Sequence, residues 1–301
     1  MELRHLRYFV AVADHGGFTR AAAALHMEQP PLSQQIRLLE RELGVVLFER
    51  LSRGARLTEA GEGLIDAARA MLRQDEAFHE RATGLARGEH GRLRVGLAGA
   101  VSLLPLVPQA VRLFREAWPG VVITLEESNT PALSDALREH RIDIAIIRPP
   151  LTDPTLQVTP LLDEPTVLAL PSGHPASNDG AVDLARIAGE PFIIFDRQLG
   201  PGFFDAQLAA CQAAGFTPNF GQVAPQIASA IPLVAAGLGV AIVPDCLRQL
   251  HAGGVTYHAI KGPAPTASLA IAARPETRGL PVVRFGELLK TLTRDESVTQ
   301  Q

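Results

Sequence analysis

The sequence has little cysteine and no long apolar run. Cys211 and Cys246 are its only cysteines, too few for a disulfide framework and without metal-ligand spacing. The longest apolar stretch, near residues 233–243, contains two glycines and is too short to cross a membrane. The charged N-terminus lacks the apolar core of a signal peptide. We therefore expect a cytoplasmic globular protein with no membrane partner, metal or cofactor.

The sequence also lacks an excess of positive charge. The whole chain carries a net charge of -4, and residues 1–60 contain eight arginines and seven acidic residues, a net of 8 − 7 = +1. Charge alone therefore gives no indication of a nucleic-acid partner. The 301 residues, 47% of them hydrophobic, are enough for sizeable cores in more than one domain.

Three short helices are predicted near the N-terminus from apolar residues at helical spacing. The first ends at Gly16 and Gly17, the second begins at Phe18, and the third runs from Pro30 to Gly44. Residues 26–29 alone separate the second from the third, which is the connection length of a helix-turn-helix. The exposed face of the third helix is predicted to bind base edges and phosphates through Ser33, Gln34, Arg37 and Arg41.

A β-ribbon wing is predicted to follow the third helix. Residues 45–48 and 57–58 are largely apolar and bracket a loop that contains Gly54. The loop has three arginines that could enter a minor groove or pair with phosphates: Arg50, Arg53 and Arg56. These patterns alone leave open a plain three-helix domain with solvated arginines.

The order of the motifs resembles the signature of the LysR-type transcriptional regulators. The resemblance rests on LRYFVAVA at 6–13, FTRAA at 18–22, QPPLSQQI at 29–36, LLE at 38–40, LG at 43–44 and LFER at 47–50. It continues through LTEAG at 57–61. The resemblance implies a winged helix-turn-helix followed by a two-lobed α/β effector domain similar to periplasmic binding proteins. The protein would then be a transcriptional regulator and not an enzyme.

The resemblance also implies a set of DNA contacts. Ser33, Gln34 and Arg37 would reach the major groove. Thr19 and Gln29, with its neighbour Pro30, would contact the DNA backbone. Arg50 and Arg53 would enter the groove beside the wing. The chain departs from the family pattern at Glu28, where serine is common, and at Gln34, where arginine is common. Glu28 could cap the third helix but would repel phosphate, whereas Gln34 favours adenine over guanine.

A long helix is predicted from residue 58 to about residue 87, with an apolar stripe and no proline. Such a helix usually pairs with its own copy because the stripe would otherwise be exposed. A two-fold dimer would bind an interrupted inverted repeat. The resemblance implies a dimer or tetramer, with RNA polymerase as a further partner.

Strand and helix patterns alternate after residue 91, which indicates two α/β lobes. In the first lobe, strands are predicted at 92–97, 121–126, 142–147 and 268–273, and helices at 103–117, 131–139 and 282–293. In the second lobe, strands are predicted at 166–170, 192–195, 220–224 and 239–243, and helices at 203–214 and 226–236. The predicted domains are residues 1–58 for DNA binding, 59–90 for the linker helix, 91–163 with 264–301 for lobe I, and 164–263 for lobe II.

An effector site is predicted between the lobes, where loops follow the strands and helix N-termini offer free N–H groups. Ser102, Ser128, Asn129, Thr130 and Phe203 occupy these loops. The resemblance adds Pro201, Gly202 and Gln226, and Arg148 could close on an acid. A carboxylate or another small anion is the predicted ligand. The simpler alternatives are that the hydroxyls only cap helices and that Arg148 is a solvated surface residue.

Three other functions fit the sequence less well. An enzyme would need a catalytic motif, and we find no GxSxG, HExxH or Walker sequence. A transport receptor would leave the N-terminal pattern unexplained. A redox sensor would need a low-pKa cysteine, but neither cysteine has an adjacent Arg, Lys or His. The glycines at 237 and 239 come between a helix and a strand in the order opposite to that of a dinucleotide-binding loop.

Overall fold

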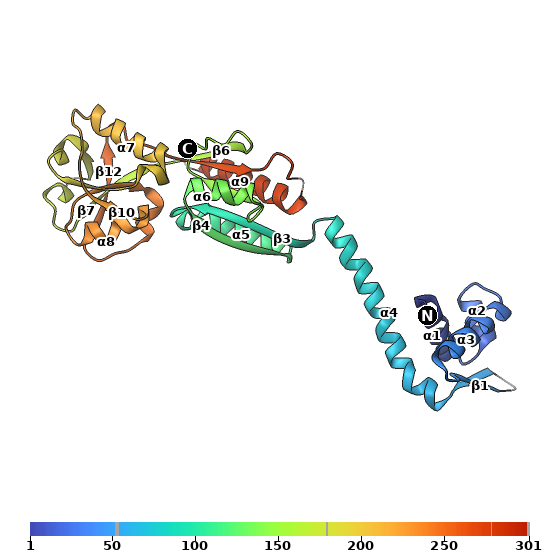
Figure 1. Ribbon diagram of the computed structural model, residues 1–301. Coiled ribbons are helices and arrows are strands. Elements are labelled where there is room, and N and C mark those ends of the chain that lie inside the picture. The colour runs from blue at the N-terminus through green and yellow to red at the C-terminus, as the bar shows by residue number, and fades with distance from the viewer. Residues whose placement is uncertain (52–53, 179, 278, 300–301) are drawn as a thin grey trace. The chain divides into compact units, whose positions relative to one another are not determined.

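The computed structural model describes residues 1–51, 54–178, 180–277 and 279–299 (Figure 1). The chain divides into two compact units, Met1–Ala86 and Arg87–Gln301, each with its own core. None of the helices in the described ranges combines the length and the apolar character that a membrane crossing requires.

The first unit contains four helices and a β-hairpin within its described residues. In chain order these are α1 (Leu3–His15), α2 (Phe18–Ala24), α3 (Gln29–Leu43), β1 (Phe48–Leu51), β2 (Gly54–Leu57) and α4 (Glu59–Ala86). Gly16 and Gly44 follow α1 and α3 in the left-handed conformation, with φ of 61° and 72°, which is the usual way for glycine to end a helix. The predicted three helices and the wing are therefore confirmed.

Phe48 anchors the wing to the helices. Its ring makes edge contacts with Phe9 of α1 and Phe18 of α2, at centroid distances of 5.5 and 5.6 Å. The first half of α4 packs on α1 through Ile65 and Ala68. Because these contacts bury large rings and aliphatic side chains from every helix, the unit has one continuous core.

The second unit contains a five-stranded sheet in the order β4-β3-β5-β13-β6. Strands β4, β3 and β5 are parallel, and β13 pairs antiparallel with both β5 and β6. The strands are β3 (His90–Ala98), β4 (Gly120–Ser128), β5 (Ile144–Ile147), β6 (Gln157–Glu164) and β13 (Ala267–Ala273); the helices are α5 (Leu106–Ala117), α6 (Thr130–Arg138), α9 (Leu280–Thr299) and the 3₁₀ turn η1 (Val101–Leu103).

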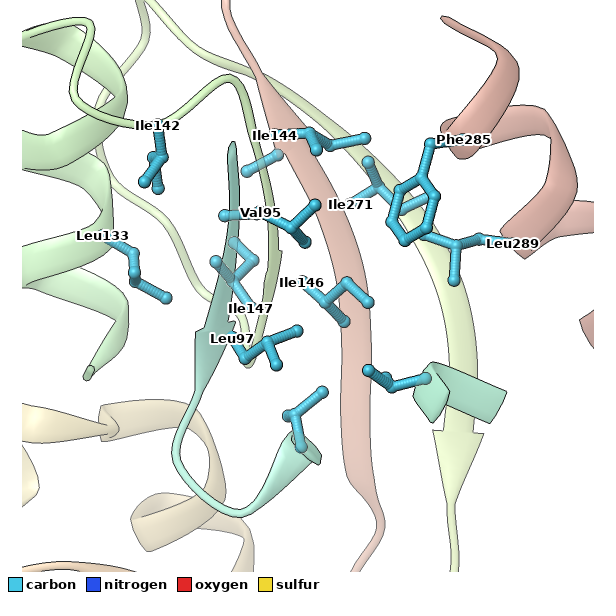
Figure 2. Packing of buried hydrophobic residues seen from close by; sticks show 14 of the residues in the cluster. Val95, Leu97, Leu133, Ile142, Ile144, Ile146, Ile147, Ile271, Phe285 and Leu289 are labelled. Carbon is cyan, nitrogen blue, oxygen red and sulfur yellow. The ribbon is translucent and has the colours of Figure 1, made fainter. Parts of the chain in front are cut away.

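Helices cover both faces of this sheet. Figure 2 shows Leu133 of α6 on one side of the strands and Phe285 and Leu289 of α9 on the other. A Cβ at Gly96 would lie 2.7 Å from Leu133 Cδ2, so the glycine lets α6 approach β3 closely. This close packing fixes the N-terminus of α6 beside the ends of β3 and β5, where the predicted effector loops begin.

The remaining strands form a four-stranded sheet in the order β11-β7-β12-β8 and a parallel pair, β10-β9. The strands are β7 (Thr166–Pro171), β8 (Ala181–Asp183), β9 (Pro191–Phe195), β10 (Asn219–Ala224), β11 (Ala241–Pro244) and β12 (Val255–Lys261). The helices are α7 (Pro201–Ala213) and α8 (Ala230–Ala235), with 3₁₀ turns η2 (Pro175–Asn178), η3 (Leu184–Ile187), η4 (Arg197–Leu199), η5 (Ile227–Ser229) and η6 (Asp245–Gln249). The chain leaves the five-stranded sheet after β6 and returns to it with β13.

Three strands of the second unit have no counterpart in the sequence predictions: β6, β8 and β12. Strand β6 is an edge strand that contains Pro160 and is mostly solvent-facing, so its sequence lacks a clear apolar alternation. Strand β8 has only three residues. In β12, the alternation of Val255, Tyr257 and Ala259 was a usable signal that the sequence analysis missed.

Candidate functional site

A surface concavity of about 530 Å³ lies between α2, α3 and the wing. It brings together three of the predicted DNA-binding residues, Thr19, Gln29 and Arg50. They come from the starts of two helices and from the first strand of the hairpin. A helix start offers free N–H groups, and an arginine offers a planar set of donors, so the concavity has the donors that a phosphate requires.

Arg50 is held in a fixed position within this concavity. Its Nη2 donates a hydrogen bond to Ser33 Oγ at 2.5 Å, and its guanidinium carbon lies 4.7 Å from the centroid of the Phe18 ring. Because both contacts act on one planar group, the guanidinium is held in one orientation within the protein itself.

Ser33 does not lie on the exposed face of α3, contrary to the sequence prediction. Its side chain is buried, with 6% of the residue exposed. It comes directly after buried Leu32 and three residues before buried Ile36, so it shares the helix face that packs inward. Its hydroxyl is engaged with the wing in this structure.

The outward face of α3 carries Gln34, Arg37 and Arg41, all exposed. Pro30 is exposed in the first turn of the same helix. Glu28 is the N-cap residue but its side chain makes no capping hydrogen bond, so the predicted carboxylate cap is wrong. Arg53, the predicted wing-tip contact, lies outside the described residues.

The second unit has a cavity of about 40 Å³ between the carboxyl ends of β3 and β5 and those of β9 and β10. Its polar lining residues are Asn129, Thr130, Arg148 and Gln226. Its other lining residues are Ala98, Gly99, Phe195, Leu199, Gly200, Phe203 and Ile227. The volume is far below the roughly 300–1,000 Å³ of typical small-molecule pockets.

Arg148 is buried, with 8% of the residue exposed, so the solvated-surface alternative is wrong. Its Nη2 donates to Glu164 Oε2 and its Nη1 to the Ala267 carbonyl, both at 2.8 Å. The Nε atom is buried without a hydrogen-bond partner. Glu164 is buried as well and accepts a second hydrogen bond from the Cys246 N–H at 2.8 Å. The pair therefore joins the end of β5 to the segment where the chain leaves the first sheet.

Two polar lining residues are already partly committed within the protein. The Thr130 hydroxyl donates to the Arg148 carbonyl at 3.1 Å and accepts from the Arg148 N–H at 3.2 Å. The Asn129 carboxamide oxygen accepts from the Ala132 N–H and caps α6. These bonds fix the start of α6 against the end of β5.

The structure places four of the predicted effector residues outside the lining of this cavity. Ser102 donates to Glu127 and lines a separate groove beside α5. The Ser128 carbonyl accepts from the Gly99 N–H. Pro201 and Gly202 begin α7, and Gly202 lies so close to the Pro149 carbonyl oxygen that a Cβ would be 2.0 Å from it.

The sequence analysis missed several lining residues, most importantly Phe195. It is the last residue of a correctly predicted strand, the position at which ligand-binding loops begin in open α/β sheets. Its ring lies nearly parallel to that of Phe203, with an interplanar angle of 11° and centroids 6.0 Å apart. The end of that strand was therefore a usable signal.

The two cysteines are buried and poorly suited to redox sensing. Burial raises the pKa of Cys211 to about 11. Burial and the nearby Glu164 carboxylate raise the pKa of Cys246 further, and its Sγ lies 3.6 Å from the Ala100 carbonyl oxygen. Because the thiolate is the reactive form, these pKa values argue against a sensor role. Within the described residues, no group of three or more His, Cys, Asp or Glu side chains could hold a metal ion.

Comparison with known families decides between these functions. Residues 3–62 match the model of the bacterial regulatory helix-turn-helix proteins of the lysR family, and residues 86–293 match the LysR substrate binding domain. This protein is a LysR-type transcriptional regulator.

Relatives and solved structures agree with this assignment. The regulator is 38% identical to the HTH-type transcriptional regulator BudR of Raoultella terrigena, over 96% of this chain and 100% of that protein. It is 37% identical to AlsR of Bacillus subtilis (strain 168), over 95% of this chain and 94% of the relative. It is similar in structure to full-length CbnR complexed with its target DNA, with a TM-score of 0.85, 27% identity, and coverage of 97% of this chain and 100% of CbnR.

These matches confirm the predicted family and fold class, a winged helix-turn-helix joined to a two-lobed effector domain. The LysR-type regulator binds DNA and controls transcription, and it is not an enzyme, since the matched relatives are themselves transcriptional regulators.

Proposed function

We propose that this LysR-type regulator senses a small anion in the cavity between its two α/β lobes and alters its binding to an operator in response. The observation that supports this most directly is Arg148, whose buried Nε lacks a hydrogen-bond partner at the lining of the cavity. A buried donor without an acceptor is costly, and an anion would supply the acceptor. Because the cavity is small, ligand entry would separate the two lobes and change their relative position.

We propose that residues 1–58 bind the DNA, with residues 59–90 as linker helix, 91–163 with 264–301 as lobe I and 164–263 as lobe II. Gln34 and Arg37 lie on the exposed face of α3 and would contact base edges. Thr19, Gln29 and Pro30 would contact the backbone, and Arg50 and Arg53 the groove beside the wing. Ser33 would act by holding Arg50 rather than by touching a base.

The proposed DNA-bound form is a dimer or a tetramer formed through α4. This helix exposes four large apolar side chains at intervals of seven residues, Leu64, Met71, Phe78 and Leu85, and 71% of Phe78 is exposed. A seven-residue apolar repeat is the pattern of a helix that pairs with another helix. The dimer would present two copies of α3 to an inverted repeat in the cytoplasm, where RNA polymerase is a further proposed partner.

Footprinting on the DNA next to the regulator's own gene tests the proposal. We expect a protected inverted repeat whose pattern changes when the effector is added. An Arg148→Gln, Glu164→Gln double variant leaves no buried charge unpaired, so it should give the same footprint without effector but no change with it. Identical footprints with and without every anion tested would contradict the sensing role. Loss of the footprint in the absence of any ligand would contradict the DNA-binding role.

A further inference from the structure

The arginines of residues 1–58 fall into two groups. Those of the first group form ion pairs with carboxylates at 2.6–2.9 Å: Arg4 with Glu2, Arg7 with Asp75 and Arg56 with Glu49. Those of the second group have no carboxylate partner within the described ranges: Arg20, Arg37, Arg41 and Arg50. The near-zero net charge of this part of the chain therefore conceals a local set of cations that acids do not neutralise.

Arg20 is the member of the second group to which no DNA contact has been assigned so far. It is exposed and lines the same concavity as Thr19, Gln29 and Arg50. Its Nη2 donates a hydrogen bond to the Gly16 carbonyl at 3.1 Å. A guanidinium carries five N–H donors, so Arg20 retains donors for a ligand after this bond is made.

The Gly16 carbonyl sets the position of Arg20 relative to the wing. The same oxygen accepts a hydrogen bond from the Ala55 N–H of β2, at 3.2 Å. This approach requires glycine in the wing, since a Cβ at Gly54 would lie 2.5 Å from the Gly16 carbonyl oxygen. Because one acceptor binds both the side chain and the hairpin, the guanidinium and the wing are held at a fixed spacing.

The concavity needs a cation beside its neutral donors if it receives a phosphate. Thr19 and Gln29, the proposed backbone contacts, carry no charge, whereas each DNA phosphate carries a full negative charge. Arg50 already bonds Ser33 and lies over the Phe18 ring. Arg20 follows Thr19 directly in α2, and hydrogen bonds from a charged donor to phosphate are about twice as strong as neutral ones.

We infer that Arg20 binds a backbone phosphate of the DNA, together with Thr19 and Gln29. Its free N–H groups donate to the phosphate oxygens, and the contact carries no sequence information. This inference rests on the proposed DNA-binding role of residues 1–58. It goes further by adding a residue that is absent from the predicted contacts.

DNA-binding titrations of the full-length protein at several KCl concentrations test the contact. The two probes are the duplex protected in the footprint and a random duplex of the same length. Each phosphate contact contributes about 0.9 to the slope of log K against log salt. Arg20→Gln should therefore flatten the slope by about 0.9 for each bound subunit, equally on both duplexes. An unchanged slope would overturn the inference even if affinity falls, because Arg20 would then only brace the turn at Gly16.

Two further variants separate a phosphate contact from effects on folding or on net charge. Arg20→Lys retains a cation that can bind phosphate, so it should keep the wild-type slope. Arg4→Gln removes one positive charge from an exposed pair in the same unit, and its slope should also match the wild type. If either variant flattens the slope as much as Arg20→Gln does, the inference is wrong.

The wild-type titrations separate this inference from the proposed function. If the wild-type protein binds neither duplex at low salt, the DNA-binding role of residues 1–58 fails, and the inference fails with it. If the wild-type protein binds both duplexes with a steep slope and Arg20→Gln keeps that slope, only the inference fails.

Discussion

Arg50 in the first strand of the wing donates a hydrogen bond to Ser33 of the recognition helix, at 2.5 Å. The same guanidinium lies over the Phe18 ring at the start of α2. One side chain therefore connects three elements of the DNA-binding unit. The hydrogen bond orients a cation at the edge of a concavity that also contains Thr19 and Gln29.

Ser33→Ala is therefore expected to weaken DNA binding although Ser33 is buried. Loss of a hydrogen bond to a charged donor should reduce affinity by about 1–2 kcal/mol, or about fivefold to thirtyfold. The loss should be similar on operator and random DNA, because Arg50 is proposed to enter the groove beside the wing without bonding a base edge. Fluorescence anisotropy with both DNAs measures this. Ser33→Thr retains the hydroxyl and is the matched control, and a loss confined to the operator would indicate base contact by Ser33.

Arg37→Ala should reduce operator binding far more than binding to random DNA. Arg37 is exposed on the outward face of α3, and a bidentate base contact is worth about 1–3 kcal/mol. Its effector affinity should stay at the wild-type value. Fluorescence anisotropy measures the DNA affinities, and calorimetry measures the effector affinity. If both affinities fall equally, the variant has damaged the fold and the assignment of Arg37 fails.

Removing Arg148 should destabilise the second unit strongly. Arg148→Met leaves Glu164 buried and unpaired, which should cost about 3–5 kcal/mol of unfolding free energy. Combining it with Glu164→Gln removes the stranded charge and should recover much of that loss. Urea unfolding of the single and double variants measures both effects. Arg197→Met breaks an exposed pair with Asp205 and should leave the unfolding free energy nearly unchanged, because solvent screens the two charges. If Arg148→Met and Arg197→Met lose the same unfolding free energy, burial does not determine the strength of these ion pairs.

Phe78→Glu should convert the oligomer into smaller species. Phe78 is the most exposed of the four apolar residues spaced by seven on α4. A carboxylate at a paired apolar position would be desolvated without a partner. Sedimentation velocity shows the change in mass. Glu76→Gln changes an exposed residue of the same helix that is not part of the repeat, and its mass should match the wild type. An unchanged mass in Phe78→Glu would place the subunit interface elsewhere.

The cysteines should react slowly with alkylating reagents near neutral pH. Since burial raises the pKa of Cys211 to about 11, its thiolate becomes abundant only as the pH approaches that value. The raised pKa of Cys211 also makes the stability of the folded protein depend on pH. The neutral thiol contributes stability below the unfolded pKa of about 8.5, and this contribution is lost as pH rises through about 11. Iodoacetamide labelling followed by mass spectrometry, with urea-unfolded protein as control, measures the difference. Rapid labelling of the folded protein at pH 7 would support a redox-sensing role for the cysteines.

Sequence patterns predicted the elements well where burial on one face is regular. The helices that pack on a sheet or on each other, such as α3 and α5, have clear helical spacing, and Gly44 marks the end of α3. The edge strand β6 has no such regularity because only one of its eight residues is buried. The sequence therefore predicts the core better than the periphery.

The candidate sites were predicted less completely because they depend on pairing between distant residues. Nothing in the local sequence of Ser33 shows that Arg50 will bond it, since 17 residues separate them. Likewise, Arg148 looked like a surface residue because its burial depends on Glu164 and on the carbonyl of Ala267, which is 119 residues away. Asn129 and Thr130 were predictable because a helix start following a strand is a local feature.

The apolar repeat of α4 also limits the DNA that the proposed dimer can recognise. A seam that repeats every seven residues permits only discrete registers, and neighbouring registers differ by about 10 Å along the helix. That step corresponds to about three base pairs of the double helix. The spacing between half-sites would therefore change in jumps rather than gradually as α4 evolves, and a regulator with one heptad inserted or deleted would need a differently spaced operator.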